Sequence, residues 1–114
     1  MSAKAVIDME HLARYTGGDA TLNAEILSLF EAQANELVGK LRSILQARDS
    51  RSWKEVTHTI KGAARGVGAF ALADAAAVCE KVDVGDAETA ARAIDDLKTH
   101  TDAVQHFMKS RLST

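Results

Sequence analysis

The chain has no proline, and phenylalanine, tryptophan and tyrosine together make up 4% of its 114 residues. Alanine and leucine are abundant instead. This combination favours helices that pack closely through small side chains over a β-sandwich. Hydrophobic residues make up 46%, an ordinary value for a globular protein. A chain of this length is expected to form one domain, residues 1–114, around a single core.

An excess of basic residues, a second cysteine and a long apolar run are also missing. The formal net charge of −2 argues against nucleic acid as a partner. Cys79 cannot form an internal disulfide, which suits a reducing compartment, and it is expected to be a small buried apolar residue. Without a signal peptide or an apolar run of about 18 residues, the sequence predicts a cytoplasmic protein with no membrane contact.

Capping residues and glycines divide the chain into five expected helices. Asp8 is a suitable N-cap for a short helix that ends near Tyr15, before two glycines. A long helix is expected from about 19–21 to 48. Ser52 and Glu55 have the spacing of a capping box, so Ser52 is expected to open the third helix, which the glycines at 66 and 68 should end or loosen. A fourth helix is expected over 69–82 and a fifth from about 86 to 111.

Apolar residues recur at intervals of three and four in these segments, which predicts one buried face on each helix. Short loops between four such helices predict an all-α protein, an up-down four-helix bundle with a short N-terminal capping helix. The positions expected to point inward are Leu22, Ile26, Leu29, Phe30, Leu37, Leu41, Ile44 and Leu45 in the long helix, Leu72, Ala75, Ala76, Cys79 and Val82 in the fourth, and Ile94, Leu97, Thr101, Val104 and Met108 in the fifth.

The third helix carries the most informative stretch of the chain, residues 58–68. At about 100° per residue, its apolar positions fall on one side, while His58, Lys61, Gly62 and Arg65 cluster about half a turn away. A glycine within a helix costs about 1 kcal/mol relative to alanine. We therefore expect an exposed histidine beside two cations, with open space next to it where Gly62 has no side chain. The apolar positions are Trp53, Val56, Ile60, Ala63 and Val67.

Metal and enzyme chemistry are poorly supported by comparison. Glu55 and His58 form one Glu-x-x-His pair, but carboxylate-bridged di-iron bundles need a second copy, which the sequence lacks. No metal site is therefore expected. His11, His100 and His106 have no ligand spacing and are expected at the surface. The chain has no Gly-x-Ser-x-Gly turn and no Gly-x-x-x-x-Gly-Lys loop for nucleotide phosphates.

The histidine stretch resembles the histidine-containing phosphotransfer (HPt) domain, whose motif runs His-x-hydrophobic-Lys-Gly, then Gly-Ala, a leucine, and an acid or amide. The flanks are also similar, at Ile7-Asp8, at Gly17-Gly18-Asp19 and in the long helix that ends before Asp49, so that the resemblance covers essentially the whole chain. Ala76, Cys79, Arg65 and Gly66 depart from residues that are common in the family. The motif positions are matched by His58, Ile60, Lys61, Gly62, Gly68, Ala69, Leu72 and Glu80.

The resemblance implies that the chain is a phosphocarrier with neither ATP binding nor kinase activity. His58 would accept a phosphoryl group through Nε2 from an aspartyl phosphate, Lys61 would offset phosphate charge, and Glu80 would orient the imidazole. Gly62 would give steric access, and Arg65 and Gly68 complete the expected binding set.

The implied partners are response-regulator receiver domains and a hybrid histidine kinase, with the chain itself a monomer. No cofactor of its own is implied, because Mg²⁺ would come with the receiver's acidic pocket. The alternative that stays open is a helical adaptor that docks without being phosphorylated.

Overall fold

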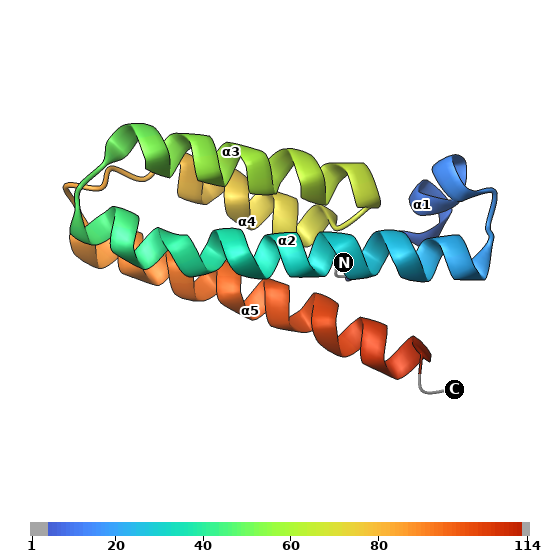
Figure 1. Cartoon of the computed structure of the whole chain (residues 1–114). Helices are drawn as coiled ribbons and strands as arrows, with labels where there is room; N and C mark the ends of the chain where they lie inside the picture. The colour runs from blue at the N-terminus through green and yellow to red at the C-terminus, as the bar shows by residue number, and fades with distance from the viewer. Residues whose placement is uncertain (1–4, 113–114) are drawn as a thin grey trace.

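In a computed structural model that describes residues 5–112, the chain forms five α-helices and no strand within that range. They are α1 (Met9–Thr16), α2 (Ala20–Gln46), α3 (Ser50–Val67), α4 (Phe70–Glu80) and α5 (Ala87–Leu112) (Figure 1). The all-α prediction is confirmed. None of the helices in this range is both long and apolar enough to cross a membrane.

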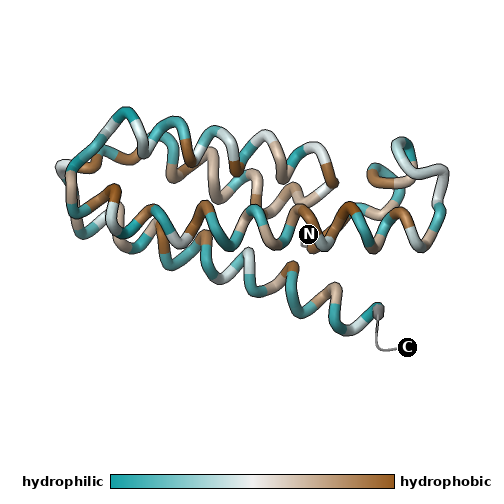
Figure 2. Tube along the Cα trace, viewed as in Figure 1, coloured by the Kyte–Doolittle hydropathy of each residue, from teal (hydrophilic) through white to brown (hydrophobic). Residues whose placement is uncertain are grey.

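The helices surround one core. α2 packs against α3 and α5, and α4 packs against the same two helices from the other side. Figure 1 shows α1 at the end of the bundle away from the α2–α3 turn, where it contacts α2 and α3. Hydrophobic residues gather on the inner sides of the helices in Figure 2. The largest fully buried side chains include Trp53, Leu12, Leu41, Ile60, Leu72, Ile94 and Leu97.

Aspartates begin four of the helices. The carboxylate of Asp8 accepts from the amide of His11, and Asp19 and Asp86 make the equivalent bonds for α2 and α5. At α3 the sequence prediction is wrong. Asp49, not Ser52, is the N-cap, and it accepts from both the amide and the hydroxyl of Ser52. α2 ends at Gln46, so three residues suffice for the reversal and α3 begins at Ser50.

Two further expectations about burial are wrong. On α2 the buried line is Leu27, Phe30, Ala34, Val38 and Leu41. Leu22 and Leu29 lie about a third of a turn or more from the centre of this line and are exposed, Leu29 by 73%. His11 and His100, both expected at the surface, are half-buried, and the His11 ring lies edge-on to Tyr15 and Phe70. Most of the other inward positions are buried or half-buried, and α4 ends two residues before Val82.

Candidate functional site

His58 lies on the outer face of α3. Trp53 and Ile60, on the opposite side of the same helix, are each 1% exposed, which fixes the rotation of α3 and turns residue 58 outward. The His58 side chain is 69% exposed. The helix that carries it is therefore anchored by its apolar face while the imidazole remains accessible.

One ring nitrogen of His58 has a carboxylate partner on the neighbouring helix. Nδ1 lies 3.1 Å from Oε2 of Glu80, the last residue of α4. A carboxylate accepts hydrogen bonds, so Glu80 favours the tautomer in which Nδ1 carries the proton. Nε2 then holds the lone pair, and it has no hydrogen bond to any described residue. The arrangement leaves one defined nitrogen for reaction with an external group.

Glu80 is itself held by Lys61. Nζ of Lys61 donates to Oε1 of Glu80 at 2.6 Å, and the two side chains are 18% and 25% exposed. The hydrogen bond from Lys61, aided by a weaker one from His58, holds the pKa of Glu80 below its ordinary value against the opposing effect of partial burial. A carboxylate at the C-terminus of a helix is disfavoured by the helix dipole, so Lys61 offsets an unfavourable position.

The end of α4 is fixed by a buried indole. Nε1 of Trp53 donates to the carbonyl of Cys79 at 2.8 Å, one residue before Glu80. The same carbonyl also accepts from the backbone amide of Val82 at 3.1 Å, so the indole supplies its second hydrogen bond and ties the last turn of α4 to α3. The Cys79 thiol is buried as expected, and burial raises its pKa to about 12, which makes it unreactive at neutral pH.

Two exposed glycines follow His58 at intervals of four. A Cβ atom added at Gly62 or Gly66 would meet nothing within 4 Å, so the space beside the histidine is open solvent. Neither glycine is required by packing within the chain. Arg65, two turns from His58 on the same face, is exposed and forms no ion pair with a described residue. The structure thus brings His58, Lys61, Gly62, Arg65 and Glu80 to one surface.

Gly68 lies outside this surface. It is buried, it ends α3 with φ of 87°, and its carbonyl oxygen accepts a hydrogen bond from the amide of Asp8 at 2.9 Å. A Cβ at this position would lie 2.8 Å from the carbonyl oxygen of Asp8. The sequence placed Gly68 in the binding set, but its geometry serves the attachment of the segment before α1 to the α3–α4 turn.

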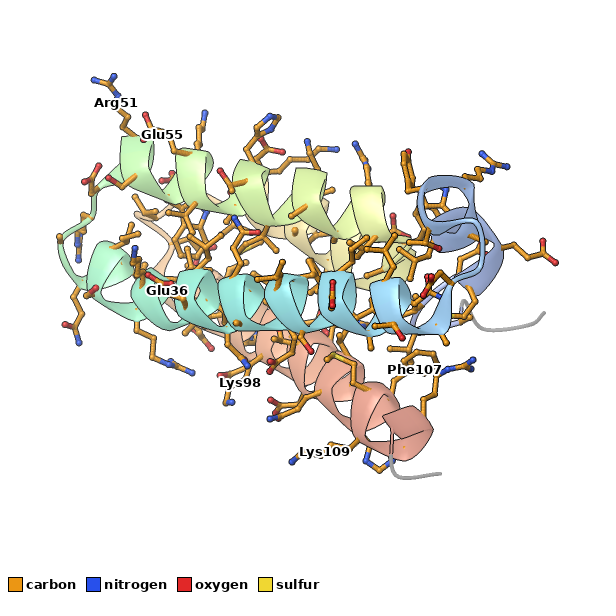
Figure 3. The ribbon with its side chains drawn as sticks, turned by 45° about the vertical axis from the view of Figure 1, so that its right-hand side comes forward. Glu36, Arg51, Glu55, Lys98, Phe107 and Lys109 are labelled. Atoms are coloured by element: carbon orange, nitrogen blue, oxygen red, sulfur yellow. The ribbon has the colours of Figure 1, made fainter. Side chains whose placement is uncertain are left out.

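A metal-binding role for the Glu-x-x-His pair finds no support in the geometry. Glu55 pairs with Arg51 at 3.2 Å, and Figure 3 shows both side chains together at the start of α3, pointing away from the bundle. Within residues 5–112 no three His, Cys, Asp or Glu side chains are grouped so that they would hold a metal ion.

The contact between Lys61 and Glu80 was not predicted. Residues 19 positions apart on different helices give no periodic signal, and Lys61 was expected to lie in solvent. The one feature of the sequence that could have predicted this contact is the position of Lys61 on the border between the apolar and polar faces of α3, because a side chain there reaches toward the neighbouring helix. The pairing itself required the relative placement of α3 and α4.

These features define a helical protein with an accessible histidine oriented by a carboxylate. The family model of the Hpt domain matches residues 25–107, and the chain belongs to this family, which supports a role in histidine phosphotransfer in phosphorelays. Its fold is similar to that of histidine-containing phosphotransfer protein B (HptB) from Pseudomonas aeruginosa PAO1, with a TM-score of 0.83, 22% identity and 96% of each chain covered. No curated protein matches the chain.

Proposed function

We propose that this protein carries a phosphoryl group on Nε2 of His58 between aspartates of receiver domains. The observation that carries the proposal is the exposed imidazole whose Nδ1 lies 3.1 Å from Glu80, because this arrangement fixes which nitrogen is nucleophilic. The chain would act as a single phosphotransfer domain over residues 1–114. The contacts of α2 and α4 with both α3 and α5 support an up-down four-helix arrangement, capped by α1.

The proposed transfer step needs no reactant other than the His58 imidazole and the aspartyl phosphate of the receiver. The Nε2 lone pair attacks the phosphorus of the aspartyl phosphate, a P–N bond forms, and the P–O bond to the aspartate breaks, so the aspartate carboxylate leaves with the electron pair. The imidazole gains positive charge, and Nδ1–H remains hydrogen-bonded to Glu80. A carboxylate at that position stabilises the charge and holds the ring in place. The reverse attack by a second aspartate returns the histidine to its starting state.

Lys61 acts in this proposal through Glu80 as well as on the phosphate. Its ammonium group already bonds to Oε1 of Glu80, so it fixes the carboxylate that orients His58. A phosphoryl group on Nε2 adds negative charge within the same cluster, and the cation offsets that charge. The sequence interpretation gave Lys61 the second role alone.

A receiver domain would approach over Gly62, where no side chain obstructs contact with the helix backbone. Arg65 would lie at the rim of this contact. The proposed donors and acceptors are receiver domains, including that of a hybrid histidine kinase. Mg²⁺ would be held by the receiver's acidic residues, so the chain would need no cofactor of its own.

The test is incubation of the full chain with a receiver domain carrying ³²P-labelled aspartyl phosphate. We expect label on the chain that is labile in acid and stable in base, and no label on His58→Gln. The matched control is His106→Gln, which changes an exposed histidine on α5 and should leave labelling unchanged. Labelling of His58→Gln, or no labelling of the unmodified chain by any receiver tested, would contradict the proposal and favour an adaptor that docks without phosphorylation.

A further inference from the structure

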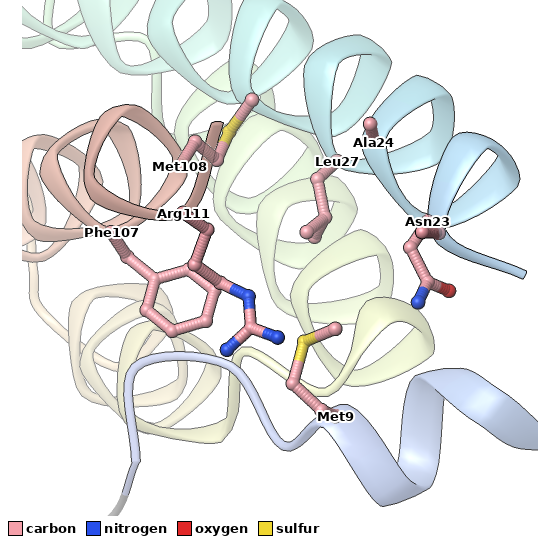
Figure 4. Close-up of a pocket in the computed structure, with 8 residues that line it drawn as sticks. Met9, Asn23, Ala24, Leu27, Phe107, Met108 and Arg111 are labelled. Atoms are coloured by element: carbon pink, nitrogen blue, oxygen red, sulfur yellow. The ribbon is translucent and has the colours of Figure 1, made fainter. Parts of the chain in front are cut away.

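The pocket drawn in Figure 4 lies where α1, the start of α2 and the end of α5 meet, and it has a volume of about 170 Å³. Its lining is mostly apolar, and none of the residues that line it belongs to the surface around His58. The fate of a phosphoryl group on His58 therefore depends on the charged side chains of α3 and α4.

Both oxygens of the Glu80 carboxylate are engaged, each with a different nitrogen. Oε2 lies 3.1 Å from Nδ1 of His58, and Oε1 accepts from Nζ of Lys61 at 2.6 Å. The bond from Lys61 is the main cause that holds the pKa of Glu80 below its ordinary value. The carboxylate therefore stays ionised beside the imidazole, and it accepts a hydrogen bond from Nδ1–H without taking the proton.

An amide at position 80 could not serve both donors. A carboxylate has two acceptor oxygens, whereas glutamine has one oxygen and one NH₂ group. With its oxygen on Lys61, glutamine would present N–H groups to Nδ1 of His58, which would then need a lone pair there instead of a proton. The family motif allows an acid or an amide at this position, so the acid is a distinguishing feature of this chain.

The other charged side chains near the imidazole leave it with one anionic partner among the described residues. Glu55, on α3, pairs with Arg51 at 3.2 Å, and on α2, which lies beside α3 in Figure 1, Glu36 and Lys40 pair with each other at 3.6 Å. Asp74 of α4 lines a groove shared with α5, which makes no contact with α3 within residues 5–112. The remaining charged groups of α3 and the end of α4 are cations, namely Lys54, Lys61, Arg65 and Lys81.

A proton on Nδ1 decides how readily a phosphoryl group leaves Nε2. When an aspartate oxygen or a water molecule attacks the phosphorus, the P–N bond breaks and its electron pair returns to Nε2. With Nδ1 protonated, the imidazole leaves as a neutral molecule, whereas without that proton it would leave as a strongly basic anion. In the reaction with water, inorganic phosphate is released and the proton of the attacking water passes to solvent.

We propose that Glu80, held by Lys61, keeps the Nδ1 proton on phosphorylated His58 and thereby makes this chain a short-lived carrier of the phosphoryl group. The group is ready for transfer and is equally exposed to loss by hydrolysis, so the chain relays a signal and does not store it. Since it concerns the phosphorylated state of His58, this property rests on the proposed function.

The test is phosphorylation of the full chain by phosphoramidate, which needs no receiver, followed by ³¹P NMR from about pH 5 to about pH 9. The resonance that His58→Gln lacks belongs to phosphorylated His58, and its movement with pH reports the protonation of Nδ1. We expect the midpoint of this titration to lie about 0.5–1 pH unit lower in Glu80→Gln, a modest shift because His58 is exposed and water screens the carboxylate. At a pH above both midpoints, the phosphohistidine of Glu80→Gln should survive about three- to tenfold longer, the factor that corresponds to this shift.

Glu36→Gln is the matched control, because its carboxylate pairs with Lys40 on its own helix, and it should change neither the midpoint nor the lifetime. Equal midpoints, or a lifetime in Glu80→Gln that is equal or shorter, would overturn the proposal. Phosphorylation on Nδ1, or no phosphorylation of His58 by phosphoramidate, would overturn it as well.

The phosphotransfer function and the short lifetime can fail separately. Labelling of His58 by a receiver together with equal lifetimes would leave the proposed function intact and overturn the role of Glu80 alone. The expected midpoints and lifetimes together with no labelling by any receiver would support the role of Glu80 and overturn the proposed function.

Discussion

The two ends of α3 are joined to the rest of the molecule by different chemistry. Toward the start and middle, side chains reach into the last turn of α4, where Trp53 bonds to the Cys79 carbonyl and Lys61 and His58 bond to Glu80. At the far end, Gly68 and Asp8 make a backbone contact with no space for a side chain. We call these two contacts the α4 joint and the Gly68 joint. Only the α4 joint is made by side chains, and it includes the ionisable groups of His58, Lys61 and Glu80.

The two contacts at the ends of α3 have different structural roles. The Gly68 joint fixes where α1 and the α3–α4 turn lie, and it depends on the absence of a side chain. The α4 joint fixes the orientation of one imidazole, and it depends on particular donors and acceptors. Substitutions should therefore change stability at one end, and both stability and transfer at the other.

The largest effect is expected for Trp53→Phe. This change removes part of a buried aromatic side chain and leaves the Cys79 carbonyl without its indole donor, so the free energy of unfolding should fall by about 3 kcal/mol. Urea denaturation followed by circular dichroism measures it. Tyr15→Phe, at a side chain that is 66% exposed, is the control and should change stability by less than about 0.5 kcal/mol. A similar small change for Trp53→Phe would show that the indole bond does not hold the α4 joint.

Gly68→Ala should cost about 2 kcal/mol. The new Cβ would lie 2.8 Å from the Asp8 carbonyl oxygen, and φ of 87° is unfavourable for alanine. Hydrogen exchange should show loss of protection in α1, while the rate of phosphotransfer stays within about twofold of the unmodified chain. Gly39→Ala is the control, because its Cβ meets nothing within 4 Å and should raise stability slightly. Slow transfer in Gly68→Ala would return Gly68 to the functional set.

Gly62→Ala should separate stability from transfer. Alanine is favoured over glycine within a helix, and the added Cβ meets nothing, so stability should rise by about 0.5–1 kcal/mol. Phosphotransfer from a receiver should nevertheless slow, since the methyl group stands where the partner would approach. The comparison is with Gly39→Ala, which should raise stability alone. Faster or unchanged transfer would mean that the open space at Gly62 is not used for docking.

The smallest effect is expected for the pH dependence of Glu80. Because its pKa is lowered in the folded chain, the carboxylate adds stability above its unfolded pKa of about 4.5, and this contribution is lost as the pH falls through the lower, folded value. The stability difference between the unmodified chain and Glu80→Gln should therefore be larger at pH 7 than at pH 3.5. Urea denaturation at both pH values measures it, with Glu36→Gln as an exposed control. A difference that grows toward acid would contradict the assigned sign.

The helices and the histidine surface were predictable because their signals are local. Apolar periodicity placed Trp53 and Ile60 inside and His58 outside, and the resemblance identified Glu80. The prediction went wrong where two local signals competed. Ser52 has capping-box spacing, but Asp49 is a stronger acceptor placed one turn earlier, and Glu55 pairs with Arg51 instead.

Contacts that depend on how the helices face one another could not be predicted from the sequence. Leu29 fits an apolar period but lies off the line that the core selects on α2. His11 contacts Phe70, nearly sixty residues along the chain, and sequence spacing could not reveal that packing. The bond from Lys61 to Glu80 belongs to the same class, since it requires α3 and α4 to be placed first.

Trp53 is the one tryptophan of the chain, and its indole donates to the carbonyl that immediately precedes Glu80. The tryptophan fluorescence of the protein therefore originates at the α4 joint. An event that shifts the last turn of α4, such as phosphorylation of His58 or docking of a partner over Gly62, should change the emission of this indole. The unlabelled molecule carries its own optical reporter for the state of its histidine.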